Sequence, residues 1–99
     1  MKQSLTMKIE LSSGFYFLLN EIIVFIALDK PIASRKFKKD LIQSIRKDLQ
    51  FPYNYKKSIY FDDVKVRDYV FKGYTLTYRI DELEENVEVF GIIKNRNNY

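Results

Sequence analysis

The side chains best suited to chemistry in this sequence are cationic and phenolic. Lysine and arginine together number 17, whereas histidine and cysteine are both absent. Guanidinium and ammonium groups can hold a phosphodiester and stabilise charge that develops in its transition state, with a tyrosine near the phosphate. Such a set supports either RNA cleavage without histidine or simple binding to an anionic surface. The candidates are Arg67, Arg79, Lys94, Arg96 and Tyr99.

Several kinds of site are disfavoured by what the sequence lacks. Without histidine and cysteine, it has neither the commonest general base nor the commonest zinc ligands, so we expect no metal site and no cofactor. The three glycines are isolated, so no glycine-rich phosphate loop is predicted. The one acidic cluster is interpreted as a solvated connection between strands and consists of Asp81, Glu82, Glu84 and Glu85.

Size and composition predict one folded domain over residues 1–99. Hydrophobic residues make up 46% of the sequence and aromatic residues 16%, which is enough for a packed core. The net charge of +4 favours anionic partners, although many small basic proteins bind nothing charged. We expect a cytoplasmic protein, because it has no cysteine and because Lys8, Glu10 and Asn20 interrupt the apolar start that a signal peptide would need.

The clearest pattern in the sequence is a three-stranded meander over residues 64–96. Apolar and polar residues alternate in residues 64–71 and again in residues 74–80, which is typical of β-strands. Lys72 and Gly73 between them predict a two-residue hairpin turn, and residues 87–93 are a third β-prone run.

Two helices are predicted before the meander. After a short strand within residues 5–11, Ser12 or Ser13 can cap a helix that extends to about Leu28. This helix is apolar nearly all round except at Asn20 and Glu21, and about 15 residues are too few to span a membrane comfortably. Its apolar surface is therefore either simple core or partly a partner-binding face.

A second helix is predicted over residues 32–49, with Asp29 as its cap and Pro31 in its first turn. Phe51-Pro52 ends this helix. Its outer face is basic, and this charge is either merely solvated or docks an acidic partner. The basic residues are Arg35, Lys36, Lys38, Lys39, Arg46 and Lys47.

The connection that follows, residues 53–61, interleaves aromatic residues with lysines. Such a segment can stack on nucleic-acid bases, or it can plug the end of a hydrophobic core. Together the elements predict an α+β fold with the order β-α-α-β-β-β. An N-terminal strand precedes an antiparallel helical hairpin, and both helices pack on one face of a sheet that contains a three-stranded antiparallel meander.

The joint order and spacing of several short segments resembles the RelE/ParE superfamily of bacterial toxins, which belong to type II toxin–antitoxin pairs. The resemblance covers roughly residues 8–96. The segments are Phe25-Ile26-Ala27-Leu28-Asp29-Lys30-Pro31-Ile32-Ala33, Phe51-Pro52, Val66-Arg67-Asp68, Lys72-Gly73-Tyr74, Leu76-Thr77-Tyr78-Arg79-Ile80, Val87-Glu88-Val89-Phe90-Gly91-Ile92-Ile93 and Lys94-Asn95-Arg96.

The resemblance implies one of two activities, poisoning of DNA gyrase or ribosome-dependent cleavage of mRNA. Thr75 stands where RNA-cleaving members often carry an arginine, and only Lys65 is a candidate for the lysine pair of others. Lys94 and Arg96 occupy positions where many ParE-like chains have His and Arg. The ParE-like branch is therefore favoured: a non-hydrolytic toxin that stabilises a plasmid or chromosome. The alternatives are a RelE-like endoribonuclease and a non-toxic nucleic-acid-binding relative.

The family pattern also implies where partners bind. The target, gyrase or the ribosome with its mRNA, is expected on the sheet face that the helices leave free and at Lys94, Asn95, Arg96 and Tyr99. An acidic antitoxin peptide that folds on binding is expected along the helical hairpin. We predict no membrane and no small-molecule substrate. The predicted antitoxin contacts are Phe17, Val24, Leu28, Arg35, Lys39 and Arg46.

Overall fold

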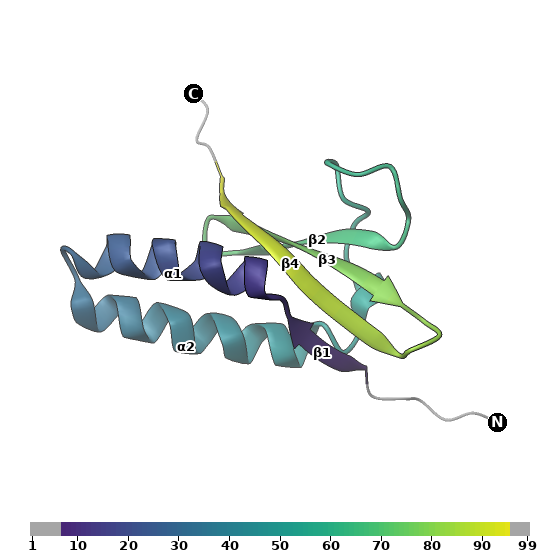
Figure 1. Cartoon of the computed structure of the whole chain (residues 1–99), viewed down its shortest axis with the longest axis horizontal. Coiled ribbons are helices and arrows are strands. Elements are labelled where there is room, and N and C mark those ends of the chain that lie inside the picture. The colour runs from purple at the N-terminus through teal and green to yellow at the C-terminus, as the bar shows by residue number, and fades with distance from the viewer. Residues whose placement is uncertain (1–6, 96–99) are drawn as a thin grey trace.

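A computed structural model of the chain describes residues 7–95, and its elements follow the predicted order (Figure 1). The α+β prediction is confirmed. The elements are β1 (Lys8–Leu11), α1 (Ser13–Ala27), α2 (Pro31–Asp48), the short 3₁₀ helix η1 (Pro52–Asn54), β2 (Val66–Phe71), β3 (Tyr74–Asp81) and β4 (Asn86–Lys94).

The strands form one four-stranded sheet in the order β1-β4-β3-β2. The meander β2-β3-β4 is antiparallel, whereas β1 pairs with β4 in parallel. Lys72 and Gly73 have φ values of 46° and 86°, the left-handed pair that a tight two-residue hairpin requires. The predicted turn between β2 and β3 is therefore present.

Both helices cover one face of this sheet, which we call the helix face. Along β3, Tyr74, Leu76, Tyr78 and Ile80 point to this face, as the period of two requires. Most of the core lies between these residues and the helices. Its other main members are Phe15, Leu19, Leu41, Ile45, Leu49, Tyr69, Val87, Val89 and Ile92.

The helix ends confirm one predicted cap and correct another. The Ser12 hydroxyl accepts a hydrogen bond from the Phe15 N–H at 3.0 Å and caps α1. The prediction that Asp29 caps α2 was wrong, because Lys30 is the cap residue and uses no side-chain bond. The N–H groups of Asp29 and Lys30 both donate to the Ile26 carbonyl, so Asp29 belongs to the end of α1.

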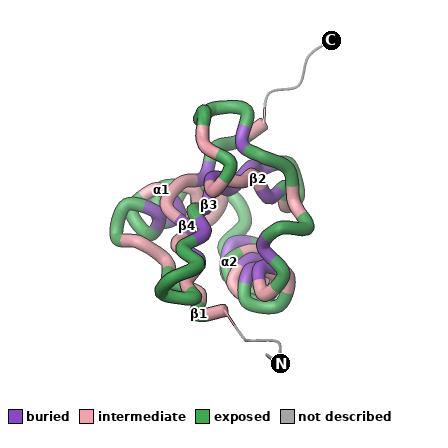
Figure 2. Tube along the Cα trace, turned by 90° about the vertical axis from the view of Figure 1, so that its right-hand side faces the viewer, coloured by how far each residue is buried: buried purple, intermediate pink, exposed green. Residues whose placement is uncertain are grey.

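The opposite face of the sheet, here the outer face, is partly covered by residues 56–65, which we call the strap. The strap is fixed to β2 by backbone bonds in which Ser58 N–H donates to the Val66 carbonyl at 2.8 Å and Asp68 N–H donates to the Lys56 carbonyl at 3.0 Å. Figure 1 shows the strap above the sheet and the helices below it, and Figure 2 shows buried stretches along both helices and the strands. Val66 is fully buried even though it points to the outer face.

Strand β2 begins later than predicted. Val64 and Lys65 lie in a turn, and the strand starts at Val66. Within residues 7–95, no helix is both long enough and apolar enough to cross a membrane.

Candidate functional site

Arg79 is the cationic candidate on the outer face, where it lies beside the strap and remains partly exposed. Its Nη1 lies 3.2 Å from Oδ2 of Asp63 in the strap, and its guanidinium lies 5.8 Å from the centre of the Phe90 ring. Phe61, also in the strap, packs edge-on against Phe90 at 5.6 Å. The charge of Arg79 is therefore already paired within the protein.

Arg67 lies on the other side of the sheet. It pairs across the strands with the buried Tyr78, and directly opposed residues share a face, so Arg67 points to the helix face. Its Nε and Nη1 donate to the carbonyls of Val64 and Tyr55, both at 2.8 Å, and its guanidinium stacks 5.0 Å from the Tyr53 ring. These contacts give Arg67 a structural role in holding the segment that leads from α2 to β2.

Lys94 and Asn95 lie at the far end of the sheet from both arginines. Lys94 pairs with Tyr74, five residues from Arg79 along β3, which corresponds to about 17 Å. The Lys94 ammonium lies 5.4 Å from the centre of the Tyr74 ring. Thr75 donates a hydrogen bond to Oδ1 of Asn95 at 2.6 Å, so Thr75 anchors the end of β4.

The structure therefore does not bring the described cationic candidates together. Arg67 and Arg79 leave the sheet on opposite faces, and Lys94 lies at a distant end. Two further candidates, Arg96 and Tyr99, lie outside the described residues.

The predicted antitoxin contacts on α1 form an exposed apolar strip. Phe17, Val24 and Leu28 are 64%, 62% and 81% exposed, although Phe15 and Leu19 on the same helix are fully buried. The strip borders a shallow groove of about 450 Å³ lined by Phe17, Asn20, Glu21, Val24, Phe25 and Leu28. Helix α1 thus has a buried core face and a large exposed apolar face, so its apolar surface is more than simple core.

The predicted antitoxin contacts on α2 form a basic stripe. Arg35, Lys39 and Arg46 are exposed, and their spacing of four and seven residues places them along one side of the helix. The opposite side of α2 carries the buried Leu41 and Ile45.

The loop after η1 both plugs the core and leaves aromatic surface free. The Tyr55 ring packs edge-on against the buried Tyr69 at 5.2 Å. Tyr60 and Ile59 remain exposed beside a hollow of about 530 Å³ that also borders Val70 and Thr75.

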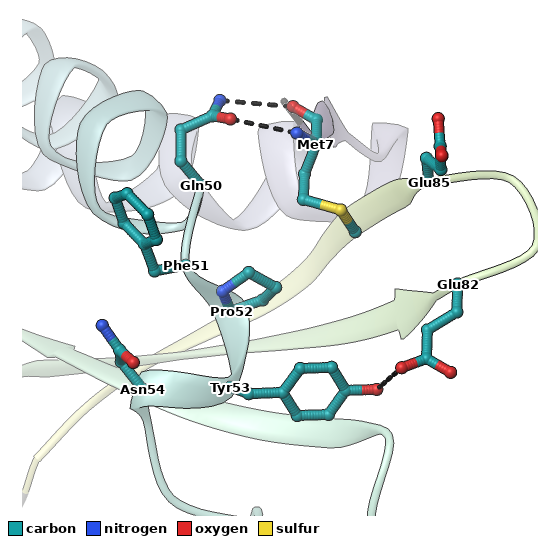
Figure 3. A pocket seen from close by; sticks show the side chains of 8 residues that line it. All are labelled: Met7, Gln50, Phe51, Pro52, Tyr53, Asn54, Glu82 and Glu85. Atoms are coloured by element: carbon teal, nitrogen blue, oxygen red, sulfur yellow. Dashed lines mark hydrogen bonds between the residues drawn. The ribbon is translucent and has the colours of Figure 1, made fainter. Parts of the chain in front are cut away.

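A second hollow, of about 460 Å³, was not predicted from the sequence (Figure 3). On one side, the Gln50 amide makes paired hydrogen bonds with the backbone of Met7 at 3.0 and 3.2 Å. On the other side, the Tyr53 hydroxyl donates to Glu82 at 2.8 Å. No pattern in the sequence signals this contact, because these two residues are 29 positions apart.

Lys65 completes the polar group at the edge of this hollow. Its ammonium lies 2.8 Å from Glu82 and 2.8 Å from the Tyr53 hydroxyl. The hydrogen bond from Lys65 lowers the pKa of Glu82, and the same bond raises the pKa of Lys65. Lys65, the one candidate for the lysine pair of RNA-cleaving relatives, is therefore engaged in a structural ion pair.

Comparison with known proteins agrees with this fold. The sequence model described as "ParE toxin of type II toxin-antitoxin system, parDE" matches residues 15–99. The solved structure of the chromosomal ParDE toxin–antitoxin system from P. aeruginosa is similar, with a TM-score of 0.73 at 15% identity, over 92% of this chain and 98% of that one. No curated protein sequence matches the chain. The chain therefore belongs to the ParE toxin family of type II toxin–antitoxin systems.

Proposed function

We propose that this protein is a cytoplasmic toxin that arrests growth by binding DNA gyrase and that an acidic antitoxin peptide neutralises it. The family supports the toxin–antitoxin assignment, and gyrase is the target that the ParE-like sequence features favour. Binding to gyrase needs a surface but no catalytic group in the toxin.

The observation that carries this proposal is the separation of Arg67 from Arg79. A ribonuclease without histidine must bring several charged groups within hydrogen-bond reach of one phosphodiester. Here the two arginines lie on opposite faces of the sheet, one bound to backbone carbonyls and the other paired with Asp63. This arrangement favours a toxin that acts by binding over one that cleaves RNA.

The helical hairpin supports the antitoxin part of the proposal. An amphipathic peptide can bury its apolar side on Phe17, Val24 and Leu28, and its carboxylates can pair with the basic stripe of α2. A peptide that is disordered alone and folds on this surface suits such a long, exposed site.

A supercoiling assay with purified gyrase tests the target. We expect micromolar protein to inhibit supercoiling, and addition of the antitoxin encoded in the neighbouring reading frame to restore it. The variant Val24→Asp should still inhibit gyrase but should no longer be rescued, because it places a charge on the antitoxin surface while α1 keeps its core face. Glu84→Gln, on the exposed β3–β4 turn, is the matched control and should behave like the wild type.

Ribosome-dependent cleavage of mRNA, the alternative activity, would give a different result in cells that express the toxin. If the protein cleaves mRNA on the ribosome, primer extension after induction will show cuts in translated messages, and Arg96→Ala will abolish them. If supercoiling is unaffected and such cuts appear, the target is the ribosome and not gyrase.

A further inference from the structure

The outward side of α1 has the spacing of a helix–helix contact. Phe17, Glu21, Val24 and Leu28 follow one another at steps of four, three and four residues. Alternating steps of three and four place residues in one line along a helix, the line that packs against a partner helix in a coiled coil. We call these four residues the α1 seam.

Glu21 is the one charged position of the seam and of α1 as a whole. It is exposed and lines the groove of the seam. Among residues 7–95, the ion pairs within 4.0 Å do not include it. Lys94 borders a hollow that Glu21 also lines, but its ammonium lies over the Tyr74 ring.

We infer that the partner of the α1 seam is an amphipathic helix that carries a lysine or arginine facing Glu21. A helix that packs on Phe17, Val24 and Leu28 removes water from the carboxylate between them, and a carboxylate without water or a counter-charge is strongly destabilised. A cation at the facing position replaces the interaction that the Glu21 carboxylate loses with water. A helix without this cation leaves the carboxylate unpaired and therefore binds less tightly. This inference rests on the proposed function, because it specifies the part of the antitoxin that docks on α1.

A second copy of the chain does not satisfy this requirement. Helix α1 has neither lysine nor arginine, so two copies packed seam to seam would bring together two carboxylates without a cation from either helix. A partner of different sequence is therefore required, and it carries a local positive charge even if it is acidic overall.

Two synthetic helical peptides test the inference on the whole protein. Both have the same apolar residues at steps of three and four and a fluorescein label, and they differ only in a central Lys or Glu. In fluorescence anisotropy titrations, we expect the Lys peptide to bind about three- to tenfold more tightly than the Glu peptide.

Variants assign this preference to Glu21. Glu21→Gln should bind both peptides equally, Glu21→Lys should reverse the preference, and Glu84→Gln should leave it unchanged. Circular dichroism checks that each variant is folded. The inference is overturned if neither peptide binds, if both bind wild type equally, or if the preference survives in Glu21→Gln. It is also overturned if the protein alone forms a dimer that Glu21→Gln strengthens, since the occupant would then be a second copy.

The supercoiling assay separates failure of this inference from failure of the proposed function. If the peptides discriminate as expected but gyrase is not inhibited, the seam and its charge requirement stand and the target is wrong. If gyrase is inhibited and rescued by the antitoxin while the peptides do not discriminate, only the inference fails.

Discussion

Arg67 and Tyr78 lie directly opposite each other on β2 and β3, and this pairing turns the arginine toward the helix face. Arg79, the next residue of β3, points to the outer face, where Asp63 of the strap pairs with it. Two arginines that are close along the sheet therefore belong to different surfaces. Arg67 holds the segment between α2 and β2 through the carbonyls of Tyr55 and Val64, and Arg79 holds the middle of the strap through Asp63.

The two arginines should differ in their contribution to stability. Arg67→Ala removes two hydrogen bonds from a charged group to the carbonyls of Val64 and Tyr55, so we expect the free energy of unfolding to fall by about 2 kcal/mol. Arg79→Ala removes an exposed ion pair and should cost less than about 1 kcal/mol. Urea denaturation measures both losses. Equal losses in the two variants would contradict the separate roles.

Stability should fall at alkaline pH because two tyrosines are buried. Burial raises the pKa of Tyr78, and burial together with a hydrogen bond to Asp48 raises the pKa of Tyr69. Above pH about 10 the unfolded chain loses these phenol protons while the folded protein retains them, so the folded state loses stability as pH rises. Each tyrosine should contribute a slope of about 1.4 kcal/mol per pH unit until its folded-state pKa is reached.

Tyr78→Phe isolates one of these contributions. The variant loses the hydrogen bond from the Tyr78 hydroxyl to the Pro52 carbonyl, at 2.6 Å, and should cost about 1 kcal/mol near neutral pH. Between pH 10 and 11 its stability should then decline less steeply than that of the wild type. Parallel urea titrations at several pH values make the comparison, and identical slopes would show that Tyr78 ionises normally in the folded state.

Thr75→Val tests the anchor at the end of β4. The substitution keeps the branched shape but removes the hydroxyl that donates to Asn95, and we expect it to cost about 1 kcal/mol. Hydrogen exchange should increase at the Asn95 N–H, which donates to the Gly73 carbonyl at 2.8 Å. Unchanged exchange at Asn95 would mean that the backbone bond alone fixes this end of the strand.

Lys72→Asn should stabilise the hairpin turn. Lys72 has a left-handed φ of 46°, which asparagine adopts at lower cost than lysine, and Asn-Gly is the preferred pair for this turn. The lost contact with Asp40 is long, at 3.8 Å, and the Lys72 side chain is largely exposed. We expect a gain of about 0.5 kcal/mol in a thermal melt. Gly73→Ala, at a φ of 86°, is the opposite case and should lose about 1–2 kcal/mol.

Much of this fold follows from local patterns. The alternation from Tyr74 to Ile80 predicts β3 because a half-buried strand has a period of two. Ser12 and Pro31 mark helix starts because one can cap an exposed N–H and the other needs no N–H of its own. Such signals depend only on neighbouring residues, so they can be interpreted without knowing the tertiary structure.

What the sequence does not reveal depends on contacts between distant segments. Val66 is buried on the outer face because the strap covers it, and the neighbouring Arg67 then has to point to the helix face. The alternation of residues 64–67 predicts a strand but not which face each residue takes, and here the strap decides it. The parallel pairing of β1 with β4 and the bond from Tyr53 to Glu82 are equally non-local.

Strand β4 contains a β-bulge opposite Thr77 and Tyr78, and this bulge determines which residue of the strand can be deleted at least cost. Val89 pairs with Tyr78 and Gly91 pairs with Thr77, so Phe90 is an extra residue without a partner on β3. A chain lacking Phe90 would keep all other pairings between β3 and β4, whereas in a chain lacking Val89 the larger Phe90 would have to take the buried position opposite Tyr78. In a thermal melt, we therefore expect the Phe90 deletion to unfold at a higher temperature than the Val89 deletion. The Phe90 deletion would also remove the ring that Phe61 and Arg79 contact on the outer face.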